Sequence, residues 1–252
     1  MRTIKNVPYL DDGNPMHLAD LYLPDEPGFA TFCFFHGGGM TKGSKDVGVF
    51  AGEYLAARGF GVVSADYRLM PEVQWPAFLE DAAAAVAWTK AHIAEYGGSG
   101  KLYVGGNSAG AYMSMMLQFD RRWLAPYGID PAEIAGYIHA AGQPTAHFAV
   151  LDSRGIDPRR VIVDETAPLY YVGCAERYSP MLIVISENDM KNRLEQTELL
   201  RSTLRHFEVP EEDVFYRLVP GKHCAYVRAV EENGESVFGK LVEEFLLQVE
   251  KV

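Results

Sequence analysis

The sequence is poor in the features that mark secreted, metal-binding or nucleic-acid-binding proteins. Only three cysteines occur in 252 residues, Cys33, Cys174 and Cys224, and no two form a Cys-x-x-Cys pair. An odd number of isolated cysteines is neither a disulfide framework nor a zinc-binding pattern. The 23 basic residues are outnumbered by 34 acidic ones, which leaves a formal net charge of −11. We therefore expect neither nucleic acids nor anionic membranes as partners, because both bind clusters of lysine and arginine.

Long hydrophobic runs are also missing. No apolar stretch approaches the roughly 20 residues that span a bilayer, and no signal-peptide core follows the early cations Arg2 and Lys5. No internal repeat, low-complexity tract or linker rich in Pro, Gly and Ser divides the chain. We therefore expect a cytoplasmic protein that folds as a single domain over residues 1–252.

What the chain does contain is an alternation of short apolar runs with longer helical patterns. Strands are predicted over residues 16–24, 30–36, 60–68, 101–107, 133–142, 180–186 and 213–221. Helices are predicted over residues 45–59, 77–97, 108–124, 192–208 and 235–252. Such alternation favours right-handed crossovers and a mostly parallel sheet with helices on both faces. We predict an open, doubly wound α/β fold whose functional residues lie in loops at the carboxyl ends of the strands.

The clearest chemical signal is the pentapeptide Gly106-Asn107-Ser108-Ala109-Gly110, which fits the pattern G-x-S-x-G between a predicted strand and a predicted helix. A serine on such a tight turn is held above the sheet edge, and the helix N-terminus directs N–H groups at negative charge forming there. The alternative is a glycine-rich turn that only packs helix on strand. The spacing fits neither G-x-G-x-x-G nor a Walker loop. We predict that Ser108 is a nucleophile.

A second glycine-rich segment, HGGG over residues 36–39, comes directly after a predicted strand. Consecutive glycines let successive N–H groups converge on one point, and together with the N–H of Ala109 they would form an oxyanion hole. A flexible loop and a metal site through His36 are the alternatives. A single histidine without a second ligand nearby is a weak indication of a metal site.

A nucleophilic serine needs a base and an acid that orients the base. Among seven histidines, His223 follows the predicted strand 213–221 at its carboxyl end, and we predict that it is the base. Asp189 and Glu187 both follow the predicted strand 180–186; we favour Asp189, with Glu187 as the close rival. The order Ser108, Asp189, His223 is that of α/β-hydrolases. The remaining histidines outside HGGG are interpreted as a helix cap (His206), core or pocket wall (His139, His147) and residues without a sign of function (His17, His92).

Four motifs in this order resemble the hormone-sensitive-lipase-like branch of the α/β-hydrolase superfamily: HGGG, DYRLMPE (66–72), WPAFLEDA (75–82) and GNSAG. The resemblance continues through SEND and PGKH and extends from about residue 18 to the end of the chain. It implies the α/β-hydrolase fold and a serine carboxylesterase without metal or organic cofactor. It implies these site residues: Ser108 as nucleophile, Asp189 and His223 as its partners, and Gly37, Gly38 and Ala109 as oxyanion donors.

Three positions depart from the family pattern. Asn107 stands where an acidic residue is usual, Ala111 where a glycine is frequent, and Met70 in place of the alanine of YRLAPE. None of the three belongs to the predicted triad, so we expect them to affect substrate preference. Arg68 and Asp81, in the two motifs without an obvious nucleophile, are expected to form a structural ion pair.

Larger members of the family carry a helical cap before HGGG. Here only 35 residues precede His36, and they are expected to form mainly a hairpin. The irregular, proline-interrupted segment 141–179 is the other place for a small, partial lid. This shortage of cap residues favours an open site and small, short-acyl esters, and the charge of −11 mildly disfavours anionic ones.

Several side chains flank the predicted site in sequence. Met40, Met70 and Tyr112 are candidates for its lining. The methionines at 113, 115 and 116 are more simply interpreted as core.

We therefore expect a small-molecule ester as the partner, cleaved in two steps through an acyl-enzyme. An arylformamidase-like amide hydrolase would use the same three residues, and only a paired comparison of ester and amide substrates would separate the two. A non-catalytic binding protein on this scaffold should show a damaged triad, whereas this one is complete. The sequence does not indicate the oligomeric state.

Overall fold

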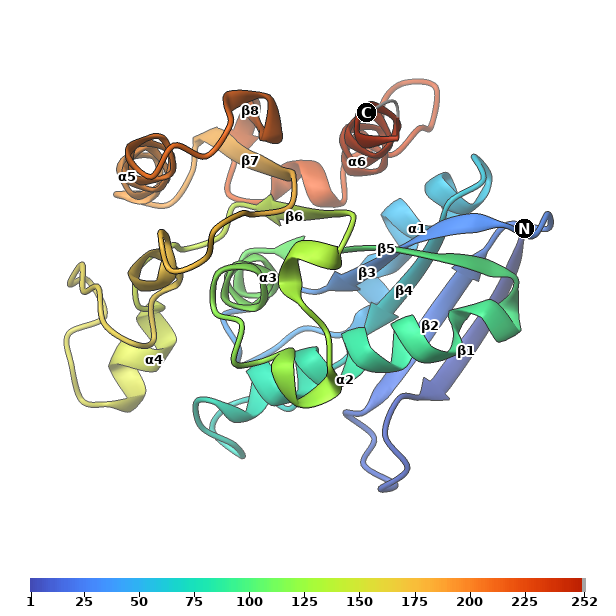
Figure 1. Cartoon of the computed structure of the whole chain (residues 1–252), viewed down its shortest axis with the longest axis horizontal. Coiled ribbons are helices and arrows are strands. Elements are labelled where there is room, and N and C mark those ends of the chain that lie inside the picture. Colours follow the sequence, from blue (N-terminus) through green and yellow to red (C-terminus); the bar gives the residue numbers. More distant parts are fainter. Residues whose placement is uncertain (251–252) are drawn as a thin grey trace.

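The computed structural model describes residues 1–250 and has at its centre an eight-stranded sheet (Figure 1). The strands are β1 (Arg2–Pro8), β2 (Leu18–Leu23), β3 (Phe29–Phe35), β4 (Gly61–Ala65), β5 (Gly98–Asn107), β6 (Gly136–Ala140), β7 (Met181–Asn188) and β8 (Val214–Lys222). The helices are α1 (Val49–Ala56), α2 (Ala77–His92), α3 (Ala109–Phe119), α4 (Phe148–Ser153), α5 (Arg193–His206) and α6 (Val237–Val249). Short 3₁₀ turns lie at Lys45–Gly48, Ile93–Tyr96, Ala125–Tyr127, Pro131–Glu133, Pro168–Tyr171, Glu211–Asp213 and Ala225–Val227.

The strands are ordered β1-β2-β4-β3-β5-β6-β7-β8. β1 pairs antiparallel with β2, and β2 antiparallel with β4, whereas every pair from β4–β3 to β7–β8 is parallel. The predicted N-terminal hairpin is therefore confirmed, and so is the mostly parallel α/β sheet. Because β3, β5, β6, β7 and β8 run in the same direction, their carboxyl ends lie along one edge of the sheet.

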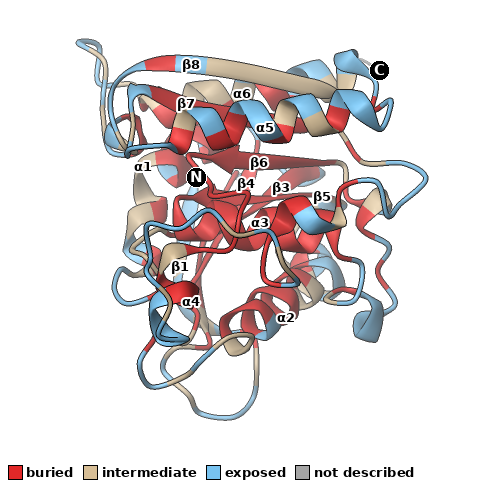
Figure 2. Ribbon diagram, turned by 90° about the vertical axis from the view of Figure 1, so that its left-hand side faces the viewer, coloured by how far each residue is buried: buried red, intermediate tan, exposed pale blue. Residues whose placement is uncertain are grey.

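Helices cover both faces of the sheet. α1 and α6 pack on one face, in a buried cluster that contains Leu55, Val62 and Phe245. α2, α3 and α5 pack on the other face, where the larger buried cluster lies. Figure 2 shows the central strands buried between these layers. All residues of β3, β4 and β6 are buried, as continuous apolar runs require when both faces of a sheet are covered.

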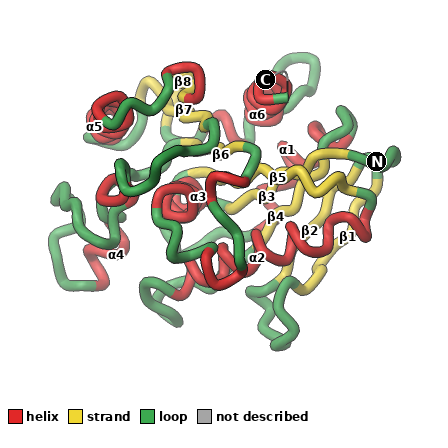
Figure 3. The backbone as a smooth tube through the Cα atoms, viewed as in Figure 1, coloured by secondary structure: helices red, strands yellow, loops and turns green. Residues whose placement is uncertain are grey.

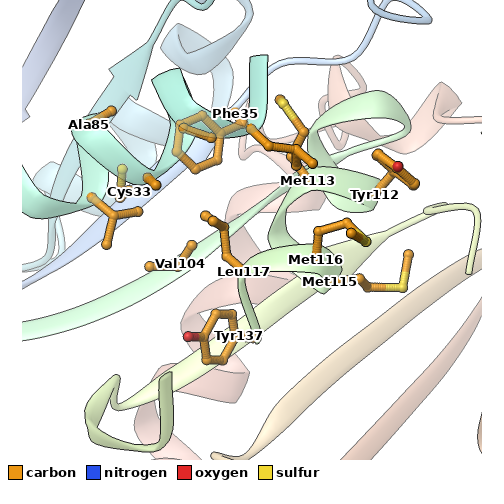
Figure 4. Close-up of a cluster of buried hydrophobic side chains, with 14 of the residues drawn as sticks. Cys33, Phe35, Ala85, Val104, Tyr112, Met113, Met115, Met116, Leu117 and Tyr137 are labelled. Carbon is orange, nitrogen blue, oxygen red and sulfur yellow. The ribbon is translucent and has the colours of Figure 1, made fainter. Parts of the chain in front are cut away.

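The methionines of α3 belong to the core, as predicted. Met113, Met115 and Met116 are buried, and Figure 4 shows Met113 and Leu117 close to the side chains of β3 and β5. Unbranched methionine side chains fill irregular space between a helix and a sheet. This packing holds the N-terminal end of α3, and hence the G-x-S-x-G turn, against the sheet.

Segment 141–179 is mostly loop, with only α4 and one 3₁₀ turn in it (Figure 3). The prediction of an irregular segment is thus confirmed, although α4 was not predicted because a six-residue helix carries almost no periodic signal. The predicted helix over 235–252 ends at Val249, and residues 251–252 lie outside the described part of the chain. None of the helices within residues 1–250 has the length and apolar character needed to cross a membrane.

Candidate active site

Ser108, Asp189 and His223 lie at the same edge of the sheet. Ser108 follows β5, Asp189 follows β7 and His223 follows β8. His223 Nε2 is 2.9 Å from Ser108 Oγ, and His223 Nδ1 is 2.6 Å from Asp189 Oδ1. Both distances are within hydrogen-bonding range. The structure therefore joins the three predicted residues in one continuous chain of contacts.

The structure separates the two candidate acids after β7. Glu187 is exposed, whereas the Asp189 side chain is 0% exposed. Asp189 Oδ1 also accepts a hydrogen bond from the Met190 N–H at 2.7 Å, which fixes the carboxylate toward His223. Asp189 Oδ2 is buried without a hydrogen-bond partner among residues 1–250. Of the two rivals, only Asp189 contacts the imidazole.

The turn that carries Ser108 is strained and closely packed. Ser108 has φ 53° and ψ −112°, outside the ordinary regions for an L-residue, and its N–H donates to Ala140 O at 2.8 Å. A Cβ atom at Gly106 or Gly110 would fall far inside van der Waals contact of Phe35 O at the end of β3. Glycine is required on both sides of Ser108 because β3 approaches the turn so closely.

The backbone N–H groups of the HGGG loop differ in whether they already donate a hydrogen bond. The Gly37 N–H donates to Asn107 Oδ1 at 3.1 Å, so in this conformation it is not free for an oxyanion, in contrast to the expectation from the family resemblance. The Gly38 and Ala109 N–H groups make no hydrogen bond to any acceptor within residues 1–250. Ala109 is the first residue of α3, whose N-terminus favours negative charge. Two of the three expected donors are therefore available.

His36 packs beneath this loop. Its ring is buried, stacks on Tyr67 with centroids 4.3 Å apart, and contacts Gly37 O through Nδ1 at 2.7 Å. Burial lowers the pKa of His36 to about 4, so the ring is neutral at pH 7. In the part of the chain that the structure describes, no three His, Cys, Asp or Glu side chains are grouped to hold a metal ion. These contacts indicate a structural role for His36.

The environment of His223 favours its protonated form. Burial of the ring opposes protonation, but the hydrogen bonds to Asp189 and to the Cys224 thiol outweigh it and raise the pKa of His223 to about 9. Cys224 Sγ lies 3.7 Å from His223 Nε2, the nitrogen that also contacts Ser108. An imidazolium stabilised in this way is the species that forms when the histidine takes a proton from a nucleophile.

The buried side chain of Arg193 links the start of α5 to the start of segment 141–179. Arg193, 3% exposed, donates to Ala141 O at 2.8 Å and to Gln143 Oε1 at 3.1 Å. Gln143 Nε2 in turn donates to Ala146 O at 2.8 Å. The sequence contains no signal for this link, because an arginine in the first turn of an amphipathic helix ordinarily faces solvent.

An open pocket of about 500 Å³ lies over Ser108. Its lining consists of Gly38, Gly39, Thr41, Lys42, Asn107, Ser108, Phe148, Met190, His223 and Cys224. The candidates Met40, Met70 and Tyr112 are instead buried in the core and do not line it. Phe148 and Met190, which no motif indicated, supply the apolar wall.

Two further predicted contacts lie outside the pocket lining. Arg68 Nη2 lies 2.6 Å from Asp81 Oδ1, and the Arg68 backbone N–H also donates to the same carboxylate, so the predicted ion pair is confirmed. His139 is buried and contacts Ser114 Oγ at 2.8 Å and Gln118 Oε1 at 2.6 Å, as a core histidine does. The Arg68–Asp81 ion pair and the contacts of His139 thus stabilise the fold around the site.

Comparisons with known proteins agree with this architecture. Residues 32–141 match a family model described as alpha/beta hydrolase fold. Esterase LipC of Mycobacterium tuberculosis is 33% identical over 118 residues, which cover 44% of this chain and 28% of LipC. The match thus spans less than a third of that relative.

Solved structures match over nearly the whole chain. Esterase B from Lactobacillus rhamnosis superposes with a TM-score of 0.79 at 16% identity and covers 99% of this chain and 86% of its own. A truncated carbohydrate esterase from gut microbiota has a TM-score of 0.80 at 19% identity, with 99% and 97% covered. At such identities the likeness establishes the fold. The chain therefore has the α/β-hydrolase fold, and its residues 32–141 match the model of the family described by that fold.

Proposed function

We propose that the protein is a serine carboxylesterase that hydrolyses small, short-acyl esters through an acyl-enzyme on Ser108. The observation that carries this proposal is the contact chain from Ser108 Oγ through His223 to Asp189, at 2.9 and 2.6 Å. Three relatives that match between a third and just under half of this chain are named esterase or carboxylesterase, which supports the same reaction.

Each of the three residues has a role in this reaction. His223 accepts the proton of Ser108 as the hydroxyl attacks the ester carbonyl, and Asp189 stabilises the resulting imidazolium. His223 then donates that proton to the leaving alcohol. Water repeats the cycle on the acyl-enzyme and releases the acid.

The oxyanion of each tetrahedral intermediate is bound by the Gly38 and Ala109 amides. Both are unengaged within residues 1–250, and one well-placed donor of this kind contributes about 3–4 kcal/mol to lowering the barrier. The Gly37 amide would join them only after Asn107 releases it. Asn107 therefore holds the loop in place in the proposed resting enzyme.

The shape of the pocket and the path of the chain around it favour a small substrate and a single catalytic domain. The pocket is open and its apolar wall is short, consisting of Phe148 and Met190, which suits a short acyl chain. Residues 1–252 act as one catalytic domain, and segment 141–179 serves as a partial lid that Arg193 anchors at its start. The isolated cysteines support a cytoplasmic location.

The test is the loss of hydrolysis on removal of the Ser108 hydroxyl. Ser108→Ala should lower kcat/KM for p-nitrophenyl butyrate by a factor on the order of 10⁶, because nucleophile and base act as a unit. A fluorophosphonate probe should label the wild type and not this variant. Ser202→Ala, an exposed serine on α5, is the matched control and should behave as wild type. Near-full activity of Ser108→Ala would refute the proposal.

Two further measurements test the preferred length of the acyl chain and the type of bond that is cleaved. Among p-nitrophenyl esters from acetate to laurate, activity should fall for the long chains, since the pocket offers them little apolar surface. Clear preference for laurate would contradict the short-acyl assignment. Matched anilides separate an amide hydrolase from an esterase, and the esterase should prefer the ester of each pair.

A further inference from the structure

Lys42 occupies a fixed position beside the proposed oxyanion amide. It belongs to the lining of the pocket over Ser108. A Cβ atom at Gly38 would collide with Lys42 O, and one at Gly43 would collide with Gly37 O, so both ends of the loop are closely packed. The φ angles of Gly38 (123°) and Gly43 (107°) permit these tight turns. The base of the Lys42 side chain is therefore held next to Gly38, while the side chain itself is exposed.

The ammonium group of Lys42 has no ion-pair partner in the described part of the chain. Within residues 1–250, Lys42 forms no ion pair, whereas the next lysine, Lys45, pairs with Asp20. The ten residues that line the pocket include neither aspartate nor glutamate. The carboxylate of the proposed triad, Asp189, is fully buried and directed at His223. In a chain of net charge −11, the lining of this pocket thus contains a cation and no acidic side chain.

We propose that Lys42 is a specificity-determining residue that selects esters carrying a second, anionic group, a carboxylate close to the scissile ester. This inference rests on the proposed esterase function. An ammonium attracts a carboxylate strongly at contact distance, whereas the repulsion from distant surface carboxylates is screened within about 8–10 Å in physiological salt. The local cation therefore outweighs the net charge of the protein, which by itself disfavours anionic substrates.

The carboxylate can be part of the leaving alcohol or part of the acyl group, and two substrate pairs distinguish these two positions. 4-Acetoxybenzoate and the neutral 4-acetoxybenzamide share an acetyl group and place the charge on the leaving alcohol. Monomethyl succinate and methyl butyrate share a methyl alcohol and place the charge on the acyl group. Hydrolysis of each is followed by pH-stat titration for the wild type, Lys42→Ala, Lys42→Arg and Lys42→Glu.

We expect the wild type to prefer the anionic member of one pair. Lys42→Ala should lower kcat/KM for that member roughly three- to tenfold, mainly through KM, because a partly exposed ion pair contributes modestly. The neutral ester should be unaffected. Lys42→Arg should retain the preference, Lys42→Glu should reverse it, and added salt should weaken it. Lys90→Ala, which removes a cation paired with Glu133 away from the pocket, is the control and should change neither ester.

The outcomes separate this inference from the proposed function. If Lys42→Ala lowers hydrolysis of neutral and anionic esters equally, Lys42 only supports the loop and the inference is overturned. If no ester is cleaved in a Ser108-dependent way, the proposed function fails. In that case calorimetric binding of 4-acetoxybenzoate to Ser108→Ala, with and without Lys42→Ala, still tests the anion site: equal affinity in the two proteins would refute it.

Discussion

Replacing Asp189 by Asn removes the charge that stabilises the His223 imidazolium while it keeps the shape of the side chain. The contacts around His223 raise its pKa from 6.5 to about 9, even though the ring, 23% exposed, is largely buried. A shift of this size corresponds to about 3 kcal/mol of stabilisation of the imidazolium. Because the imidazolium also forms in the transition state and Asp189 is the largest of the groups that stabilise it, the variant should lose up to roughly 10²-fold in kcat/KM where wild-type His223 is neutral, above pH 9.

The pH dependence of this loss is the sharper part of the prediction. In the proposed mechanism the reaction requires neutral His223, so wild-type activity should rise with pH to a midpoint near 9. In Asp189→Asn the midpoint should fall toward 6.5, because burial disfavours the charged ring and only the Cys224 contact is left to favour it. The two profiles should therefore converge near pH 7 and diverge in alkali.

The assay is the pH profile of kcat/KM for p-nitrophenyl acetate, together with an NMR titration of the His223 ring protons. Glu187→Gln is the matched control, because it removes a carboxylate two residues away that is exposed and does not contact the imidazole. It should leave the midpoint unchanged. An Asp189→Asn profile parallel to that of the wild type would refute the assignment of Asp189 as the charge partner of His223.

Two further predictions concern the turn and the stability of the fold. Gly110→Ala should abolish fluorophosphonate labelling and lower the melting temperature, because the new methyl group collides with a carbonyl of β3; labelling at the wild-type rate would contradict the packing described above. Burial lowers the pKa of His36 to about 4 and of His139 and His147 to about 3, whereas burial raises that of Asp66 to about 6. The unfolded chain thus binds more protons between pH 6.5 and 4. As the pH is lowered from 6.5 to 4, the free energy of unfolding in urea should therefore fall by about 1.4 kcal/mol per pH unit for each proton that the unfolded chain binds in excess of the native one. A free energy that stays constant over this range would contradict the prediction.

Much of the fold could be predicted because its signals are local. β3 is a continuous apolar run and α2 is rich in alanine with acids near its start, so both are identified from neighbouring residues alone. The same holds for the turns at HGGG and G-x-S-x-G, where glycine is required by the close approach of backbone segments. α4 could not be predicted, because six residues contain fewer than two helical turns.

The parts of the site that could not be predicted depend on residues far apart in the chain. Asn107 engages the Gly37 amide across 70 positions, and Arg193 reaches Ala141 across 52. Proximity of Met40 to the motif in sequence suggested a place in the pocket, but its side chain is buried in the core. None of these contacts leaves a pattern in composition or periodicity.

The sequence by itself determined the alternation of the longer strands and helices, the tight turn at Ser108 and the position of His223 after the last strand. These depend on short-range preferences and on residue types that only one backbone geometry accommodates. Only the tertiary structure decided between Glu187 and Asp189, and between free and engaged amides at Gly38 and Gly37. Those choices depend on how the loop after β7 turns toward β8 and how β3 meets β5, and such three-dimensional packing is not encoded in any local run of residues.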